Sequence, residues 1–215
     1  HNLFFLKNLL KGNLAATKIQ IVPNIVADIF FEPPDKKSPK VGKIELPMKY
    51  ILFCGRLTPV KGAKELIQAF VLIKSLFPTL KLVIAYPSVQ YDQSYFKEIK
   101  QIILTSNIRR SVVFLRDVSQ KDLVPLYRNA KCTILPSAFE MSPLVVLESL
   151  ACGTPVIATD TGDIAQTLSY IDPQLVLHNN HPKTIMAKLL YVLKQNKQWR
   201  EHIKRRAITI STKHQ

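Results

Sequence analysis

Short apolar runs alternate with longer segments that carry a helical apolar stripe, and this alternation constrains the fold more than any other feature of the sequence. The apolar runs span residues 50–54, 81–85, 111–115, 132–135, 156–158 and 175–177. The helical segments span residues 63–76, 91–105, 119–130 (with Ser119 as the N-cap), 143–151, 164–169, 182–194 and 198–209. Such alternation predicts an α/β fold, a doubly wound parallel sheet of about six strands with helices on both faces. Ligands bind beyond the carboxyl ends of such strands, so the loops that follow the strands are candidates for function.

One stretch, PSAFEMSPLVVLESLACGTPVIATDTG at residues 136–162, places two carboxylates in unusual surroundings. Ser142 can serve as the N-cap of a helix, with Pro143 in the first helical position, where its missing N–H costs nothing. This helix is apolar nearly all round and should be buried, yet it carries Glu148, and Glu140 lies just before its start. A buried carboxylate needs hydrogen-bond donors, while the N–H groups at a helix start bind phosphate. Together these features predict a nucleotide pocket.

The loop after the first apolar run, GRLTPVKG, brings two cations to the same edge of the predicted sheet. Gly55 leaves room for a ligand to approach the backbone closely. Arg56 offers a planar fork to phosphate oxygens, and Lys61 offers a mobile point charge. The pair could neutralise a diphosphate without a metal ion. On this loop alone, the alternative that both are solvated loop charges stays open.

The charge balance favours anionic partners, because 30 Lys and Arg residues against 15 Asp and Glu residues give a formal net charge of +15. The basic residues concentrate at 36–49 and 194–213, without the interleaved aromatic residues of a single-strand nucleic-acid groove. No zinc-finger, RNP or helix-turn-helix motif is present either, so we expect no nucleic-acid partner. The solvated faces of a basic protein explain these segments equally well.

The cysteines and the apolar runs predict a cytoplasmic location. The three cysteines lie in apolar contexts without CxxC spacing, which is typical of buried thiols in a reducing compartment, and no metal site is expected. No run reaches the roughly 18–20 residues of a membrane span. Peripheral contact with an anionic membrane stays open, because the last helix carries an apolar stripe beside basic residues 204–206. That stripe consists of Trp199, Ile203, Ala207 and Ile210. Packing of the stripe on its own domain is the alternative.

Two stretches together, GRLTPVKGAKELIQAF and PSAFEMSPLVVLESLACGTPVIAT, resemble the donor-binding domain of the retaining glycosyltransferases of family 4, the glycosyl transferases group 1. The resemblance covers most of the chain, and the Glu-x7-Glu spacing followed by ACGTPV is specific. It implies a Rossmann-like domain, the C-terminal half of a GT-B architecture, that binds a nucleotide diphosphate sugar and needs no metal or cofactor. The run KIQIVPN resembles the joint between the two domains of these enzymes. Residues 1–23 are then a remnant of the N-terminal acceptor domain, 24–48 an interdomain linker and 49–215 the nucleotide-sugar-binding domain.

The resemblance also implies a role for each matching residue. Arg56 and Lys61 match the pair that binds the diphosphate, and Glu140 matches the carboxylate beside the donor sugar; these three are the implied catalytic residues. Glu148 matches the carboxylate that holds the ribose hydroxyls. The other implied nucleotide-sugar-binding residues are Gly55, Arg116, Val118, Ser142, Leu144 and Val145. The backbone of 142–145 meets sugar and phosphate in this family, and the loop of Arg116 and Val118 contacts the base.

The chain departs from the family pattern where it carries Met141, Ser142 and Pro143 in place of glycines, and Asp163 and Gln166 in place of a Gly and a Glu. Because Pro143 has no N–H, any backbone contact with phosphate or sugar at this point must come from Leu144 and Val145.

The resemblance implies the donor-binding half of a retaining enzyme that transfers a sugar to a glycan or lipid acceptor. We expect this chain to be inactive without the acceptor domain. Two alternatives stay open: a sucrose- or glycogen-synthase-like enzyme of the same architecture, and a non-catalytic polyanion-binding or scaffold domain of the same fold.

Overall fold

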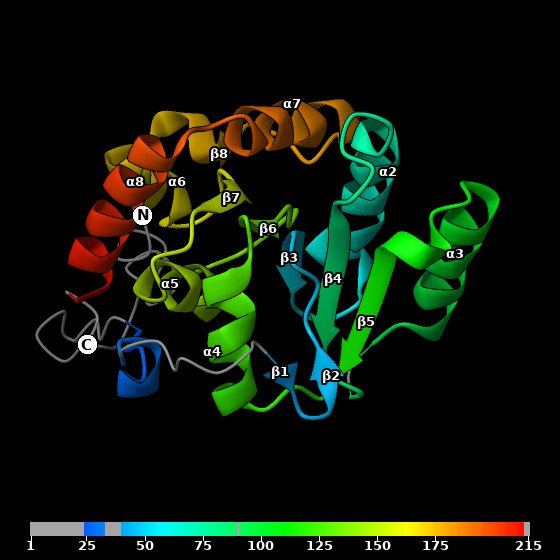
Figure 1. Ribbon diagram of the computed structural model, residues 1–215, viewed down its shortest axis with the longest axis horizontal. Helices are drawn as coiled ribbons and strands as arrows, with labels where there is room; N and C mark the ends of the chain where they lie inside the picture. The colour runs from blue at the N-terminus through cyan, green and yellow to red at the C-terminus, as the bar shows by residue number, and fades with distance from the viewer. Residues whose placement is uncertain (1–23, 33–39, 90, 213–215) are drawn as a thin grey trace, which may run out of the picture.

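The computed structural model describes residues 24–32, 40–89 and 91–212, which fold around a six-stranded sheet (Figure 1). The strands are β3 (Tyr50–Cys54), β4 (Lys81–Tyr86), β5 (Val112–Arg116), β6 (Thr133–Leu135), β7 (Val156–Thr159) and β8 (Val176–Leu177). Their order is β5-β4-β3-β6-β7-β8, and every neighbouring pair is parallel. The prediction of a doubly wound parallel sheet of about six strands is confirmed.

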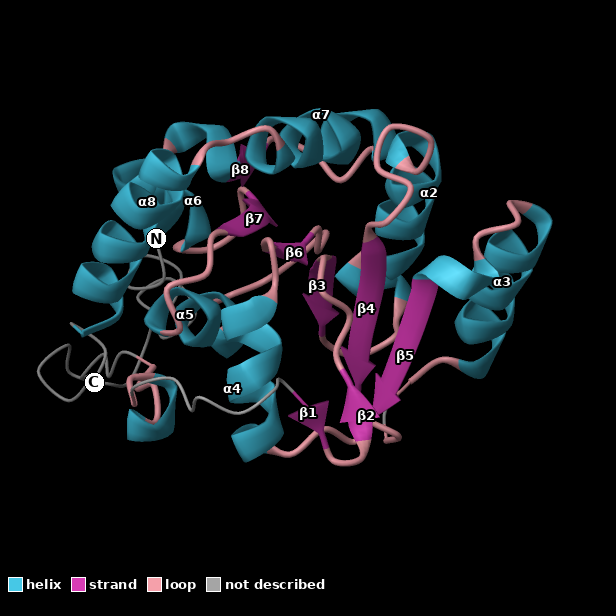
Figure 2. Cartoon of the chain, in the orientation of Figure 1, coloured by secondary structure: helices cyan, strands magenta, loops and turns pink. Residues whose placement is uncertain are grey.

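Helices follow the strands in the predicted alternation (Figure 2). The α-helices are α2 (Ala63–Ile73), α3 (Gln93–Thr105), α4 (Gln120–Asn129), α5 (Leu144–Ala151), α6 (Ile164–Ile171), α7 (Pro182–Leu193) and α8 (Lys197–Ser211). Short 3-10 segments are η3 (Pro59–Lys61), η4 (Arg109–Ser111) and η5 (Pro173–Leu175). The predicted cap of α4 is confirmed, because the Ser119 hydroxyl accepts a hydrogen bond from the Asp122 N–H at 3.2 Å.

Both faces of the sheet are buried, as its continuous apolar strands require. In β3, Ile51 and Phe53 belong to one hydrophobic cluster, whereas Tyr50 and Leu52 belong to another. Helices α2, α3 and α7 contribute to the first cluster, α4 contributes to the second, and α5 contributes to both. The sheet is therefore held between two layers of helices, which fixes the loops at its carboxyl edge.

The segment 24–48, expected to be an irregular linker, contains regular structure. It forms η2 (Asp28–Phe30) and an antiparallel pair, β1 (Lys40–Val41) with β2 (Ile44–Glu45). Val26 and Phe30 are each 1% exposed and belong to the cluster on the α4 side of the sheet. Apolar burial thus attaches residues 26 and 30 to the domain, and the described part of the segment is not wholly irregular; its role as an interdomain linker stays a prediction. Residues 1–23, expected to be the acceptor-domain remnant, lie outside the described residues.

The apolar stripe of α8 packs on its own domain. Ile203 and Ala207 are buried in the main core, and α8 contacts α5 and α6. Trp199 is half-buried and donates its ring N–H to the Asp172 carboxylate at 3.0 Å. The membrane-binding alternative needed this stripe to face outward, and its burial removes that basis. Within the described residues, none of the helices combines the length and the apolar character that a membrane crossing needs.

Candidate functional site

The loops after β3 and β6 meet where the order of the strands reverses, which is the switch point at which ligands bind in such sheets. The Ala138 N–H donates to the Val60 carbonyl at 2.8 Å. Gly62 has a left-handed backbone (φ +70°), and a Cβ there would overlap the carbonyl oxygen of Pro136. Only glycine can adopt this left-handed conformation and lie so close to the Pro136 carbonyl. The loops after β3 and β6 are therefore packed against each other at the edge of the sheet.

Lys61 and Glu140, predicted from separate motifs, are in direct contact at this edge. The Lys61 Nζ lies 2.5 Å from the Glu140 Oε1, with the two side chains 16% and 9% exposed. The buried Ser137 hydroxyl donates to the same carboxylate oxygen at 2.7 Å. Thr159, at the end of β7, donates to the Ser137 carbonyl at 2.5 Å. Lys61 and Ser137, from the loops after β3 and β6, therefore hold the Glu140 carboxylate, and Thr159 in turn holds Ser137.

The loop after β7 closes on the same point. Gly162 has a φ of +58°, and a Cβ there would overlap the carbonyl oxygen of Met141. The backbone of residue 141 therefore contacts Gly162 although Met141 stands where the family pattern has a glycine. The Met141 side chain is 64% exposed, as is that of Phe139, so both side chains line the open rim of the edge.

Helix α5 starts one residue later than predicted. Its first residue is Leu144, and the N-cap position is taken by Pro143, in an extended conformation and without a side-chain cap. The predicted capping role of Ser142 is wrong, because the helix begins one residue later, so that Pro143 and not Ser142 holds the N-cap position. The Ser142 carbonyl accepts a hydrogen bond from the Asn24 side chain at 2.6 Å, and the Val146 N–H donates to the Pro143 carbonyl. The N–H groups of Leu144 and Val145 then lie in the first helical turn, where no intrahelical acceptor exists.

Glu148 lies in the middle of α5, half-buried, and its partner comes from α4. The Tyr127 hydroxyl donates to the Glu148 Oε2 at 2.9 Å. Burial raises the pKa of Glu148, and the Tyr127 hydrogen bond lowers it by a smaller amount. The Cys54 thiol, at the end of β3, also contacts the Tyr127 hydroxyl, and burial raises its pKa to about 11. Since no ion pair within the described residues involves Glu148, its carboxylate can still accept ligand hydroxyls.

The remaining predicted residues lie around this centre. Gly55 is half-buried at the end of β3, and a Cβ there would make only ordinary contact with the Phe53 ring. Arg56 is exposed on the loop that carries Lys61. Arg116 is the last residue of β5, two strands from β3, and its side chain, 68% exposed, lies 3.7 Å from the Asp117 carboxylate. Val118 packs on the α4 side of the sheet. The structure thus joins Lys61 to Glu140 and leaves Arg116 and Val118 apart from them.

Two residues that contact the predicted carboxylates, Ser137 and Tyr127, are absent from the predicted site. Tyr127 lies on the apolar stripe of the predicted helix 119–130, a pattern that indicates a core residue. A buried tyrosine usually finds a partner for its hydroxyl, so its presence near an apolar helix with an unexplained carboxylate was the available signal. Ser137 offered no signal, since its role depends on a loop contact.

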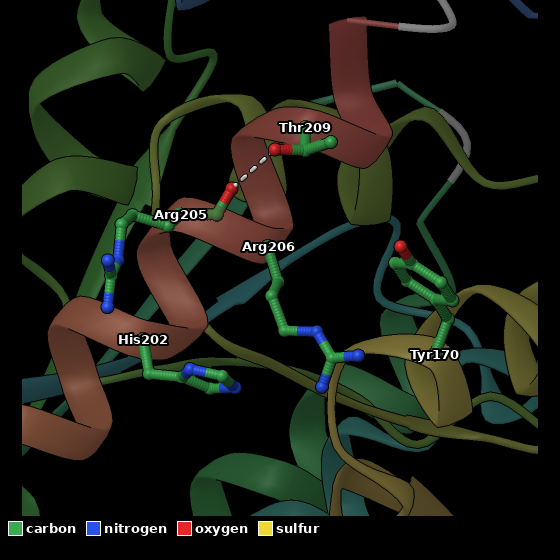
Figure 3. A pocket seen from close by; sticks show the side chains of 5 residues that line it. All are labelled: Tyr170, His202, Arg205, Arg206 and Thr209. Atoms are coloured by element: carbon green, nitrogen blue, oxygen red, sulfur yellow. Dashed lines mark hydrogen bonds between the residues drawn. The ribbon is translucent and has the colours of Figure 1, made fainter.

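A hollow of about 300 Å³ lies between α6 and α8 (Figure 3). It is lined by Tyr170, His202, Arg205, Arg206 and Thr209. The Arg206 guanidinium donates to the Ile171 carbonyl at 3.1 Å and lies 5.0 Å from the Tyr170 ring centre. Because no carboxylate lines this hollow, its chemistry suits anions. None of the predicted site residues contributes to it.

The site around Lys61, Glu140 and Glu148 can hold an anion and hydroxyl groups at one sheet edge. Cations and first-turn N–H groups suit phosphates, and carboxylates suit sugar hydroxyls. Within the described residues, no three His, Cys, Asp or Glu side chains gather as metal ligands would.

Comparisons with known proteins bear on the family and the fold of this chain. A D-inositol 3-phosphate glycosyltransferase from Acidothermus cellulolyticus is 30% identical over 171 residues, which cover 77% of this chain and 38% of that protein. The chain spans less than half the length of this curated relative. The C-terminal domain of the group 1 glycosyltransferase LpcC from Francisella tularensis has a TM-score of 0.75 at 20% identity, covering 87% of this chain and 97% of that one. HepE from Anabaena, solved with UDP-glucose, has a TM-score of 0.69 at 21% identity, covering 77% of this chain and 44% of that one.

The family model described as glycosyl transferases group 1 matches residues 34–209, which include every predicted site residue. The strand order and the helices on both faces match the C-terminal domains of GT-B glycosyltransferases. Together, the family match and the fold show that this chain belongs to the glycosyl transferases group 1.

Proposed function

We propose that this chain is the donor-binding half of a glycosyltransferase and binds a nucleotide diphosphate sugar at the switch point between β3 and β6. The observation that carries the proposal is the meeting of Lys61, Glu140 and the start of α5 at one edge, with the half-buried Glu148 in the same helix. The Anabaena relative was solved with UDP-glucose, which supports a nucleotide sugar as the ligand class.

Each part of the donor has a matching group. Arg56 and Lys61 bind the diphosphate together with the first-turn N–H groups of α5. Lys61 already donates one hydrogen bond to Glu140. An ammonium group has three donors, so Lys61 can bridge that carboxylate and a phosphate oxygen. Glu148 accepts the ribose hydroxyls, and Glu140 accepts hydroxyls of the sugar. The loop of Arg116 and Val118, two strands away, meets the base.

The proposed chemistry is transfer of the sugar with retention of its anomeric configuration and without a metal ion. Cleavage of the sugar–phosphate bond places negative charge on the departing diphosphate and positive character on the sugar ring. Preorganised cations and helix-end N–H groups stabilise that state more than the ground state, which is what lowers the barrier. Glu140, held by Lys61 and Ser137, orients the sugar without reorganising.

The acceptor, a glycan or a lipid, is proposed to bind to parts of the enzyme outside this chain. The chain covers 38% of one curated relative and 46% of another, so most of the length of those proteins has no counterpart here. We therefore expect the 215-residue chain to bind donor and to show no transfer by itself. Full transferase activity from the isolated chain would contradict this division of roles.

Calorimetric titration of the chain with UDP-glucose, GDP-mannose and ADP-glucose tests the proposal. One of these donors should bind, and Glu148→Ala and Arg56→Ala should each weaken binding by about tenfold or more, as expected for the loss of a charge-assisted contact. Glu98→Ala is the matched control, because Glu98 is an exposed carboxylate on α3 that pairs with Lys64. The proposal fails if no nucleotide sugar binds, or if all three variants bind like the unchanged chain.

The hollow between α6 and α8 favours a second candidate function, binding of a polyanion by a domain without catalytic activity. Its lining is cationic, and the guanidinium of Arg206 is held in position by neutral groups. In that case heparin should bind tightly, Arg205→Ala should weaken this binding, and no nucleotide sugar should bind.

A further inference from the structure

The Tyr127 hydroxyl is the link between α4 and the Glu148 carboxylate. Tyr127 is fully buried, so its hydroxyl has no access to solvent and depends on protein partners. It donates to the Glu148 Oε2 at 2.9 Å across 21 positions of sequence. The Cys54 thiol contacts the same hydroxyl from the end of β3. Three elements therefore meet at this one oxygen atom.

We propose that Tyr127 is a positioning residue for donor binding: its hydroxyl fixes the Glu148 carboxylate so that the remaining oxygen lone pairs accept the two ribose hydroxyls. The inference rests on the proposed function of Glu148. A carboxylate has about four acceptor sites, and Tyr127 occupies one of them, which leaves enough for a pair of neighbouring hydroxyls. Without the Tyr127 hydroxyl, the Glu148 side chain would populate several rotamers in its half-buried site. Binding of the ligand would then have to order that side chain, which lowers the affinity.

The same hydrogen bond favours the charged form of the carboxylate, which is the form that accepts hydroxyl protons. Burial raises the pKa of Glu148 and Tyr127 lowers it, so loss of the hydroxyl moves the pKa further upward. The neighbouring thiols, Cys54 and Cys152, do not titrate near neutral pH. Burial raises the pKa of Cys54 to about 11 and that of Cys152 to about 12. Both thiols therefore stay protonated at neutral pH, and a change in the pH profile on loss of the Tyr127 hydroxyl can be assigned to the Glu148 carboxylate.

Tyr127→Phe tests the inference through the pH profile of donor binding. Donor binding should weaken by about five- to tenfold at pH 7, the loss expected for one hydrogen bond to a charged group. The pH at which binding falls to half should move upward, so that part of the loss is recovered at higher pH. A purely structural role of the hydroxyl would lower affinity equally at every pH.

Tyr50→Phe is the matched control. Tyr50 is also fully buried, and its hydroxyl donates to the Leu126 carbonyl of α4 at 2.7 Å. The change therefore removes one buried tyrosine hydroxyl from the same region and leaves Glu148 untouched. Its pH profile should coincide with that of the unchanged chain.

Two further measurements keep the outcome decisive. If Tyr127→Phe does not fold, the Tyr50→Phe chain can be produced with 3-fluorotyrosine, whose more acidic hydroxyl donates more strongly and should move the half-binding pH downward. If Glu148→Ala abolishes binding while Tyr127→Phe and the fluorinated chain keep the original profile, the positioning role is refuted and the donor site stands. If Glu148→Ala leaves binding unchanged, the proposed function of Glu148 itself is refuted.

Discussion

Glu148 is a residue whose proposed role in donor binding comes with a cost to the stability of the fold. Its carboxylate lies half-buried in an otherwise apolar helix, where one hydrogen bond from Tyr127 offsets only part of the lost hydration. Burial raises its pKa, so the folded state favours the neutral form more than the unfolded state does. Ionisation of Glu148 therefore costs stability as pH rises through the pKa of the folded state. A loss of folding stability at a residue of a candidate site is expected where a protein needs a polar group for function rather than for the fold.

Glu148→Gln should stabilise the domain at neutral pH and weaken donor binding. The amide keeps an acceptor for Tyr127 without the buried charge, so we expect a gain of about 1 kcal/mol and a rise in Tm of about 2–4 °C. The gain should disappear below the ordinary pKa of glutamate, where both proteins carry a neutral side chain. Thermal unfolding at several pH values measures this difference.

Glu98→Gln serves as the comparison for that experiment, since Glu98 is an exposed carboxylate with a surface partner, and its change should leave Tm within about 1 °C. A Glu148→Gln protein that is less stable than the unchanged chain at pH 7 would show that the charge supports the fold.

The loops after β3 and β6 depend on glycine where local sequence gives little warning. Gly62 ends the 3-10 segment η3 and precedes α2, which any turn-forming glycine could do. Its particular requirement comes from Pro136, whose carbonyl oxygen occupies the space that a side chain would need. The contact sets the distance between Lys61 and Glu140, which lie 79 positions apart in sequence.

Gly62→Ala should destabilise the domain by about 3 kcal/mol or more and weaken donor binding as well. About 1–2 kcal/mol comes from the left-handed backbone, and the remainder comes from the overlap with Pro136. Denaturant unfolding and donor titration measure the two effects.

Gly42→Ala separates the two causes, because Gly42 has a φ of +56° and open space around its Cβ position. It should cost only the backbone part and leave donor binding unchanged. Equal losses of stability in the two variants would contradict the role of the Pro136 contact.

The elements were predictable from local pattern, whereas the contacts that make the site were not. The alternation of apolar runs identified all six strands, and Ser119 marked the start of α4 because N-cap chemistry is local. Ser142 has the same chemistry but is not the cap, because α5 begins only at Leu144 and Pro143 holds the N-cap position. The pairing of Lys61 with Glu140 and of Tyr127 with Glu148 likewise depends on strand order, which no single stretch of sequence contains.

Helix α8 closes the molecule by packing on elements that come before it in the chain. Ile203 and Ala207 enter the main core, and the Ser211 hydroxyl lies 3.4 Å from the Leu147 carbonyl of α5. The opposite side of α8 carries the basic residues that line the hollow in Figure 3. One helix thus supports α5, which holds Glu148, and also presents cations to solvent.

Ile203→Ala should destabilise the whole domain by about 2–5 kcal/mol, because Ile203 is 1% exposed and its removal leaves a cavity. Unfolding should remain a single transition if α8 is an integral part of the core. Ile208→Ala makes the same change at a half-buried position of the same helix and should cost clearly less. Similar losses for the two variants would show that α8 is only loosely attached.

The hydrogen bond from the Asn24 side chain to the Ser142 carbonyl connects the first described segment to the peptide just before α5. Val26 and Phe30 anchor that segment in the core a few residues later. A displacement of the chain at Asn24 would therefore pull directly on the backbone next to Leu144 and Val145. The side-chain amide of Asn24 thereby ties the first described segment to the helix start at which we propose that the phosphates bind.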